Sequence, residues 1–381
     1  MDLLPVAPLD ELRQRRSEKW LRFPPDVLPL FVAEMDFALA PPVTAVLHDA
    51  IDRGDTGYPV SHPVLGEALA GFAADRWGWR IDPASVTAVA DVGIGVVEVL
   101  RALCRPGDDV VFCPPVYPPF YDWVPEAGAH IVEVPLDRQT AGWRLDLPAL
   151  ERAFASGPVA FVLCNPHNPV GRAHTPDELA EVVRLATAYG VTVVSDEIHG
   201  PLALPGAAYT PMLTVPGAAD VTVNVVSASK AWNLAGLKCA SVVTASPSMA
   251  AVVDRFPAET AARVGHLGVL ASVAAYTEGV PWLDQLLATL DDRRTLLGQL
   301  LRERLPMLTW QPPEATYLAW LDCTALGGGD RARELFLDKG RVALERGGRF
   351  GAAGSDFVRF NFATSPEILD AATTQMAAAV P

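Results

Sequence analysis

The sequence is poor in the features that mark several classes of protein. It has five cysteines, scattered and without a CxxC pair, so it predicts buried free thiols rather than a zinc site or a disulfide framework. No run of about 18 apolar residues occurs, which speaks against a membrane span. The N-terminus has mixed charges and no apolar stretch of signal-peptide length, so we expect a cytoplasmic protein. The cysteines are Cys104, Cys113, Cys164, Cys239 and Cys323.

Basic residues are also scarce relative to acidic ones. The chain has 30 Lys and Arg against 45 Asp and Glu, a formal net charge of −15. A surface this acidic repels phosphate backbones, and no stretch of the chain supplies a dense basic patch, so nucleic acid is not an expected partner. The length of 381 residues, half of them hydrophobic, fits two domains or one large domain with an appendage.

The hydrophobic pattern divides the chain into three parts. Residues 1–45 are proline-rich and irregular, and we expect them to form an N-terminal segment that packs with the smaller C-terminal domain. Over residues 46–280, continuous apolar runs such as PVAFVLCNP and VTVNVVSAS alternate with amphipathic segments, which indicates a large α/β domain with a mostly parallel sheet covered on both faces. Residues 281–381 begin with a long helical pattern and predict a smaller α+β domain.

Polar residues follow the predicted strands at their carboxyl ends, where such sheets bind ligands. The segment VADVGIGVVEVL places a glycine turn before a helix, which suits a phosphate site, although a tight connection uses glycine for structural reasons as well. The segment CNPHNPVGR contains two Asn-Pro pairs. This loop is either simply stiff or holds an Asn amide toward a ligand oxygen.

Two further strand ends carry ionisable side chains. Asp196 and Glu197 end the run VTVVSDE, where a carboxylate serves either as a helix cap or as the partner of a cationic ring nitrogen. Lys230 directly follows a buried strand in SASKAW, where desolvation lowers the pKa of an amine and suits Schiff-base chemistry. Lys238 and Ser227 are placed to face a common anion. A phosphate turn, an Asn, an Asp and a Lys together match what pyridoxal 5′-phosphate (PLP) requires of a protein.

The order of these motifs resembles the fold-type I PLP enzymes of the aspartate aminotransferase superfamily. Within that superfamily the chain is most similar to cystathionine β-lyases of the MalY/PatB type, which are class I/II aminotransferase relatives. The resemblance covers residues 28–366 and implies a large domain with a mostly parallel seven-stranded sheet plus a smaller α+β domain. The motifs are LPLFVAEMDF, TGYPVSHPVLGEAL, PPVYPPFY, CNPHNPVGR, SDEIHG, SASKAWNLAGLK and VRFNFATSP.

The resemblance implies roles for the residues that face the cofactor ring. Lys230 would form the Schiff base and act as the proton-transfer base. Asp196 would pair with the protonated ring nitrogen, and Asn168 would donate to the phenolic oxygen. His199 would lie near that oxygen, and Tyr117 would stack on the ring.

It also implies how the phosphate and the substrate are held. Val92 and Gly93, with Ser227 and Lys238, would hold the phosphate. Tyr58 would reach the phosphate of a partner subunit, which implies a homodimer with shared active sites. The remaining implied contacts are to the amino-acid substrate: Arg359 would clamp its α-carboxylate, and Asn165 would face it.

The activity implied is an α,β-elimination that converts L-cystathionine or another cysteine S-conjugate to a thiol, pyruvate and ammonia. An aminotransferase is the first alternative, because the same residues serve both reactions. A tailoring enzyme of specialised metabolism, which cleaves a thiol conjugate or performs a decarboxylative deamination, is another. A PLP-fold regulator is disfavoured by the acidic charge and by the lack of a DNA-binding extension before residue 1.

Overall fold

The computed structural model describes residues 3–60, 63–140 and 142–381. Its centre is a seven-stranded sheet of order β2-β10-β9-β8-β7-β3-β4. Only β10 runs antiparallel to its neighbours, so the predicted mostly parallel seven-stranded sheet is confirmed. The strands are β2 (Val86–Val89), β3 (Asp109–Phe112), β4 (His130–Glu133), β7 (Ala160–Cys164), β8 (Thr192–Asp196), β9 (Thr222–Val226) and β10 (Ala240–Val243).

Helices cover both faces of this sheet, and alternate strand residues point into two different cores. Val111 and Leu163 pack with one set of helices, whereas Val110 and Val162 pack with the other. This alternation explains why the strands are apolar throughout. The first set is α7 (Leu147–Phe154) and α8 (Pro176–Tyr189); the second is α5 (Val92–Leu103), α6 (Phe120–Glu126) and α9 (Pro247–Val253).

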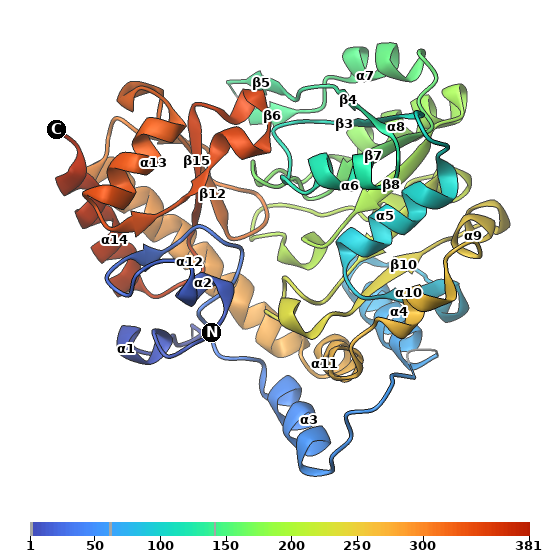
Figure 1. The fold of residues 1–381 in the computed structure, drawn as a ribbon, viewed down its shortest axis with the longest axis horizontal. Helices are drawn as coiled ribbons and strands as arrows, with labels where there is room; N and C mark the ends of the chain where they lie inside the picture. The colour runs from blue at the N-terminus through green and yellow to red at the C-terminus, as the bar shows by residue number, and fades with distance from the viewer. Residues whose placement is uncertain (1–2, 61–62, 141) are drawn as a thin grey trace.

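Local sequence determines several of these helix ends. The hydroxyl of Thr175 accepts the backbone N–H of Glu178, whose side chain accepts the N–H of Thr175 in return, so α8 begins with a capping box. The same helix ends at Gly190, which has a positive φ of 69°. Further helices beside β2 and at the lower margin in Figure 1 are α3 (Pro41–Asp52), α4 (Val64–Trp77), α10 (Ala258–Ala262) and α11 (His266–Thr277).

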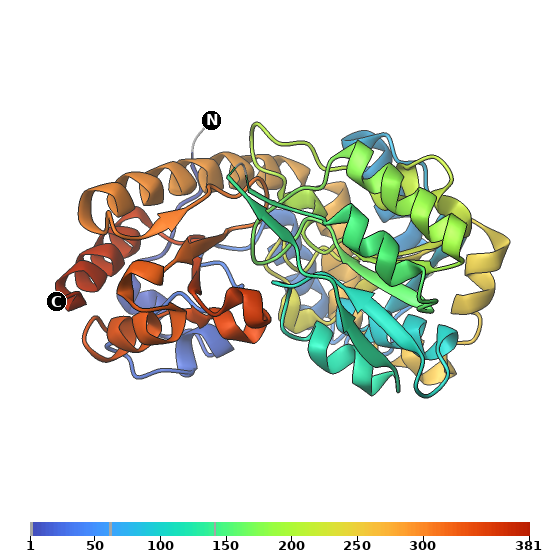
Figure 2. The same ribbon diagram turned by 90° about the horizontal axis from the view of Figure 1, so that it is seen from above.

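The C-terminal part forms a separate layer to one side of the large sheet, as the orange and red elements in Figures 1 and 2 show. It begins with the long helix α12 and contains an antiparallel four-stranded sheet of order β11-β12-β15-β14. Its elements are α12 (Val280–Arg304), β11 (Thr309–Trp310), β12 (Leu318–Asp322), α13 (Gly329–Asp338), β13 (Val342–Ala343), β14 (Glu345–Arg346), β15 (Phe357–Asn361) and α14 (Pro366–Ala379).

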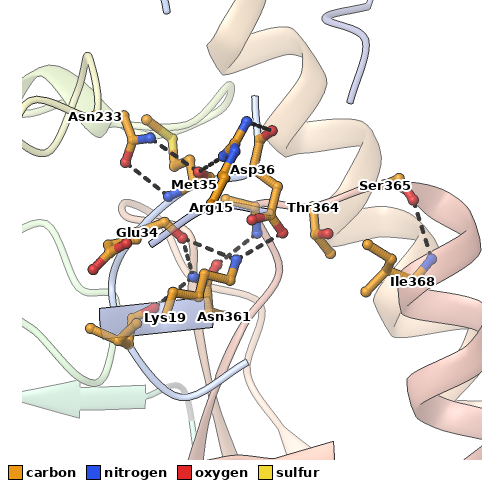
Figure 3. A network of polar contacts seen from close by, with 12 residues as sticks. Arg15, Lys19, Glu34, Met35, Asp36, Asn233, Asn361, Thr364, Ser365 and Ile368 are labelled. Atoms are coloured by element: carbon orange, nitrogen blue, oxygen red, sulfur yellow. Dashed lines mark hydrogen bonds and ion pairs between the residues drawn. The ribbon is translucent and has the colours of Figure 1, made fainter. Parts of the chain in front are cut away.

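The N-terminal segment joins this smaller unit, because β1 pairs in parallel with β13. Lys19 and Asp36 form a buried ion pair of 2.8 Å within the segment (Figure 3). The boundaries at residues 45 and 280 stay a prediction. The segment contains α1 (Leu9–Leu12), α2 (Glu18–Leu21) and β1 (Leu28–Pro29); a small hairpin elsewhere consists of β5 (Asp137–Gln139) and β6 (Gly142–Arg144).

Short 3-10 turns complete the described elements. They are Pro83–Ser85, Gly200–Leu202, Met212–Thr214, Ala218–Asp220, Ala235–Leu237, Thr324–Leu326, Gly347–Phe350 and Ala352–Gly354. Among the described residues, no helix combines the length and the apolar character that crossing a membrane requires.

Candidate active site

A cavity of about 830 Å³ lies where the large sheet, the N-terminal segment and the smaller unit meet. Side chains from all three parts line it, including those at the carboxyl ends of β7 and β8. Most of the predicted site residues come together here, whereas Ser227, Asn165 and Tyr58 do not line the cavity. Those that do are Val92, Gly93, Tyr117, Asn168, Asp196, His199, Lys230, Lys238 and Arg359.

Asp196 is the last residue of β8 and is buried. One carboxylate oxygen accepts the backbone N–H of Ile198 at 3.1 Å. Burial raises the pKa of Asp196 to about 7, although this hydrogen bond and the nearby Lys230 act in the opposite direction. A cationic partner would stabilise the ionised form of this buried carboxylate, and the protonated nitrogen of a pyridine ring is such a partner.

Lys230 lies in the loop after β9, half-buried at the cavity wall. Its Nζ donates to the backbone oxygen of Ala33 at 3.0 Å. Burial, followed by the positive charge of Arg359, lowers the pKa of Lys230 to about 8. A lysine of this kind supplies a neutral amine close to neutral pH, which both Schiff-base formation and proton abstraction require.

Arg359, on β15, is buried, and its donors are only partly used. Its Nη1 donates to Asn168 Oδ1 at 3.2 Å, its Nη2 donates to the backbone oxygen of Phe31 at 2.9 Å, and the guanidinium lies 5.0 Å from the Phe350 ring centroid. Its buried Nε has no hydrogen-bond partner among the described residues. Because a buried donor without a partner is costly, this guanidinium is suited to receive a carboxylate.

His199 is a second buried side chain with an unused ring atom. Its Nδ1 has no hydrogen-bond partner in the described part of the chain. Burial, followed by the charges of Lys230 and Arg359, lowers the pKa of His199 to about 3, so its ring is neutral. Tyr117 lies half-buried at the cavity wall with its ring edge-to-face against Trp123, at 5.8 Å between centroids.

The start of α5 also lines the cavity. Asp91 caps the helix by accepting the N–H of Ile94 at 2.9 Å, and its other oxygen accepts Lys238 Nζ at 3.0 Å. A Cβ at Gly93 would lie 2.9 Å from the ring of Trp123, so packing alone requires a glycine there. Backbone N–H groups and a lysine at a helix N-terminus suit a phosphate.

Ser227 and Asn165 do not line the cavity themselves and use their side chains in contacts with the protein backbone. The Ser227 hydroxyl donates to the backbone oxygen of Cys239 at 2.7 Å and accepts the N–H of Ser229. Ser229 lines the cavity instead. In the sequence, only its position next to Lys230 could have indicated that it belongs to the site. Asn165 is fully buried and donates to the backbone oxygen of Thr210 at 3.0 Å.

Tyr58 lies in the loop between α3 and α4 and is 90% exposed. This loop runs along the lower margin of the molecule in Figure 1, and Tyr58 is not among the residues that line the cavity. Ser61 and His62 of the same sequence motif lie outside the described residues.

The residues of the cavity fit PLP. The donor set contains an amine of lowered pKa, a buried carboxylate that needs a cation, a helix start with a lysine, and an arginine with an unused donor. The fold and this site define a PLP-dependent enzyme of fold type I.

Comparison with known proteins identifies the family. The chain matches the family described as "Aminotransferase class I and II" over residues 25–375 and belongs to it. A protein of Mycobacterium leprae (strain TN) named "Putative cystathionine beta-lyase" is 46% identical over 98% of this chain and 96% of that protein. "Cystathionine beta-lyase PatB" of Bacillus subtilis is 35% identical over 88% of each chain. The crystal structure of cystalysin from Treponema denticola, which contains PLP, superposes with a TM-score of 0.91 at 26% identity and covers 99% of this chain and 98% of its own.

Proposed function

We propose that the protein is a PLP-dependent carbon–sulfur β-lyase, which releases a thiol, pyruvate and ammonia from L-cystathionine or another cysteine S-conjugate. The observation that carries the proposal is that Lys230, an amine with a pKa of about 8, shares one cavity with Arg359, whose buried Nε has no hydrogen-bond partner among the described residues. The names of the relatives support elimination of sulfur as the reaction.

Bound PLP supplies an electron sink for the negative charge that develops at the substrate Cα. Asp196 would keep a proton on the ring nitrogen of the cofactor. Asn168 and His199 would face its phenolic oxygen, and Tyr117 would pack on the ring face. The phosphate would lie at the start of α5, held by Val92, Gly93 and Lys238, with Ser229 beside them. Ser227 would support this site indirectly, because its hydroxyl accepts the N–H of Ser229.

The substrate would be held by its α-carboxylate, which Arg359 binds through Nε and one Nη nitrogen. The amine of Lys230 would remove the proton from Cα of the bound substrate. The bond between Cβ and sulfur then breaks, and the sulfur leaves with the electron pair as a thiolate. Water converts the remaining three-carbon fragment to pyruvate and ammonia. Asn165 is proposed to act indirectly, because it stiffens the loop that carries Asn168.

We also propose a homodimer with shared active sites. Tyr58 is exposed, and so are three apolar side chains near it in the sequence, those of Ile51, Val60 and Val64. Contiguous exposed apolar residues favour a protein interface, and such an interface would bring Tyr58 to the phosphate of the partner subunit. The five free cysteines support a cytoplasmic location.

One experiment separates the lyase from an aminotransferase, which uses the same residues as far as the loss of the Cα proton. The purified protein is incubated with L-cystathionine, with and without 2-oxoglutarate. A lyase releases thiol and pyruvate at the same rate under both conditions. Formation of glutamate that depends on 2-oxoglutarate, without release of thiol, would contradict the proposal.

A further inference from the structure

The cavity changes in character from its closed end to its mouth. Part of the wall is apolar, with the rings of Phe23 and Phe31 packed edge-to-face at 5.1 Å between centroids. Val32 and Leu344 extend this apolar wall. Nearer the solvent the lining is charged, and cations outnumber anions: Glu18, Arg22, Arg333, Glu345, Arg346 and Arg349.

Most of these outer charges have partners already. Arg22 pairs with Glu18 at 3.2 Å, and Arg349 pairs with Glu345 at 3.3 Å. The third arginine of this group, Arg346, pairs with Asp330, which is outside the lining, at 3.1 Å.

Arg333 is the exception. It projects from α13, is half-buried and lines the cavity. No hydrogen bond or ion pair joins its guanidinium to any other described side chain. An arginine in this setting has lost part of its hydration without gaining a counter-ion, so it favours an anionic ligand over a neutral one.

We propose that Arg333 binds a carboxylate at the far end of the substrate's thiol part. The substrates would then be cysteine S-conjugates whose leaving thiol ends in a carboxylate and whose thioether chain lies along Phe23 and Phe31. This inference rests on the proposed lyase function and deepens it. Arg333 is not needed to bind the α-carboxylate of the substrate, because the proposed function assigns that group to Arg359, which donates to Asn168.

A pair of substrates tests the proposal on the holoenzyme. S-(3-carboxypropyl)-L-cysteine and S-butyl-L-cysteine have the same chain length and differ only in the terminal carboxylate. We expect kcat/KM for thiol release to be about tenfold higher for the carboxylate, the size of one charge-assisted hydrogen bond. Arg333→Gln should abolish this preference and leave the rate with S-butyl-L-cysteine unchanged. Equal kcat/KM values for both substrates in the unaltered enzyme would overturn the inference.

The matched control is Arg331→Gln on the same helix. Arg331 is exposed and is not part of the cavity lining, so its replacement should preserve the tenfold preference. A similar loss of preference in both variants would mean that the general charge of α13, rather than Arg333 itself, recognises the substrate, and would overturn the inference.

Calorimetric binding to the holoenzyme separates this inference from the lyase proposal. L-2-aminosuberate and L-2-aminooctanoate carry a methylene group in place of sulfur, so they have no thiolate to lose. Tighter binding of aminosuberate that disappears in Arg333→Gln supports the carboxylate site even if no thioether is cleaved, in which case only the lyase proposal fails. Equal binding of the two ligands overturns the carboxylate site even if thiol release is observed.

Discussion

Lys230 Nζ lies 3.0 Å from the backbone oxygen of Ala33, which also accepts the hydroxyl of Tyr317 at 3.0 Å. The central amine of the cavity is therefore in contact with the N-terminal segment and, through that segment, with the smaller unit. Asn361 on β15 donates to the oxygens of Val32 and Glu34, on either side of Ala33. Figure 3 shows Asn361 beside Glu34. The position of this acceptor thus depends on contacts between residues far apart in the sequence.

Replacing Asn361 should destabilise the protein. Asn361→Ala removes one of the two donors from each of the oxygens of Val32 and Glu34, and it leaves the N–H of Ala363 without its acceptor. We expect the free energy of unfolding in urea to fall by about 2 kcal/mol or more. Gln14→Ala, at an exposed position of the N-terminal segment, is the control and should change it by less than about 0.5 kcal/mol. Equal effects of the two substitutions would show that the contacts of Asn361 contribute nothing.

Asp196 should make the stability of the cofactor-free protein depend on pH. Its pKa is raised from 3.8 to about 7 by burial, so between these values the folded state retains a proton that the unfolded chain has lost. Stability therefore falls as pH rises through this window, by at most about 4 kcal/mol. Asp196→Asn removes this contribution, whereas the contribution of Glu197, whose pKa is also raised to about 7, remains in both proteins.

The measurement is the free energy of unfolding at pH 4 and pH 8 for the two proteins. The parent protein should lose more stability than Asp196→Asn across this interval. Parallel pH profiles would contradict the raised pKa.

Tyr58 should act across the subunit interface. Tyr58→Ala and Lys230→Ala would each damage every site of a homodimer. A mixed dimer of the two variants, however, contains one site with both residues intact. Co-expression should therefore restore up to about a quarter of the parent activity, because half of the dimers are mixed and each has one good site. Tyr189, exposed on α8, provides the control Tyr189→Phe, which should be fully active. No recovery in the mixture would argue that Tyr58 acts within its own chain or not at all.

The sheet and the closed end of the site were predictable because they depend on local patterns. Continuous apolar runs indicate strands covered on both faces, and the carboxyl ends of parallel strands meet at one edge, which brings Asp196 and Asn168 together. Residues whose placement depends on loop direction or on domain packing were not predictable. Ser227 and Ser229 flank the same alanine, and only the turn of the loop decides which of them faces the cavity. Arg333 reaches the cavity only because α13 packs beside β14.

The most direct test of the account is product formation from L-cystathionine by the holoenzyme and by Lys230→Ala. Thiol, pyruvate and ammonia should appear in equal amounts with the unaltered enzyme. Lys230→Ala should lower the rate by at least about a thousandfold, because the substitution removes both the cofactor attachment and the proton-transfer base. Equal thiol release by the two proteins, or the absence of thiol with the unaltered enzyme, would contradict the account.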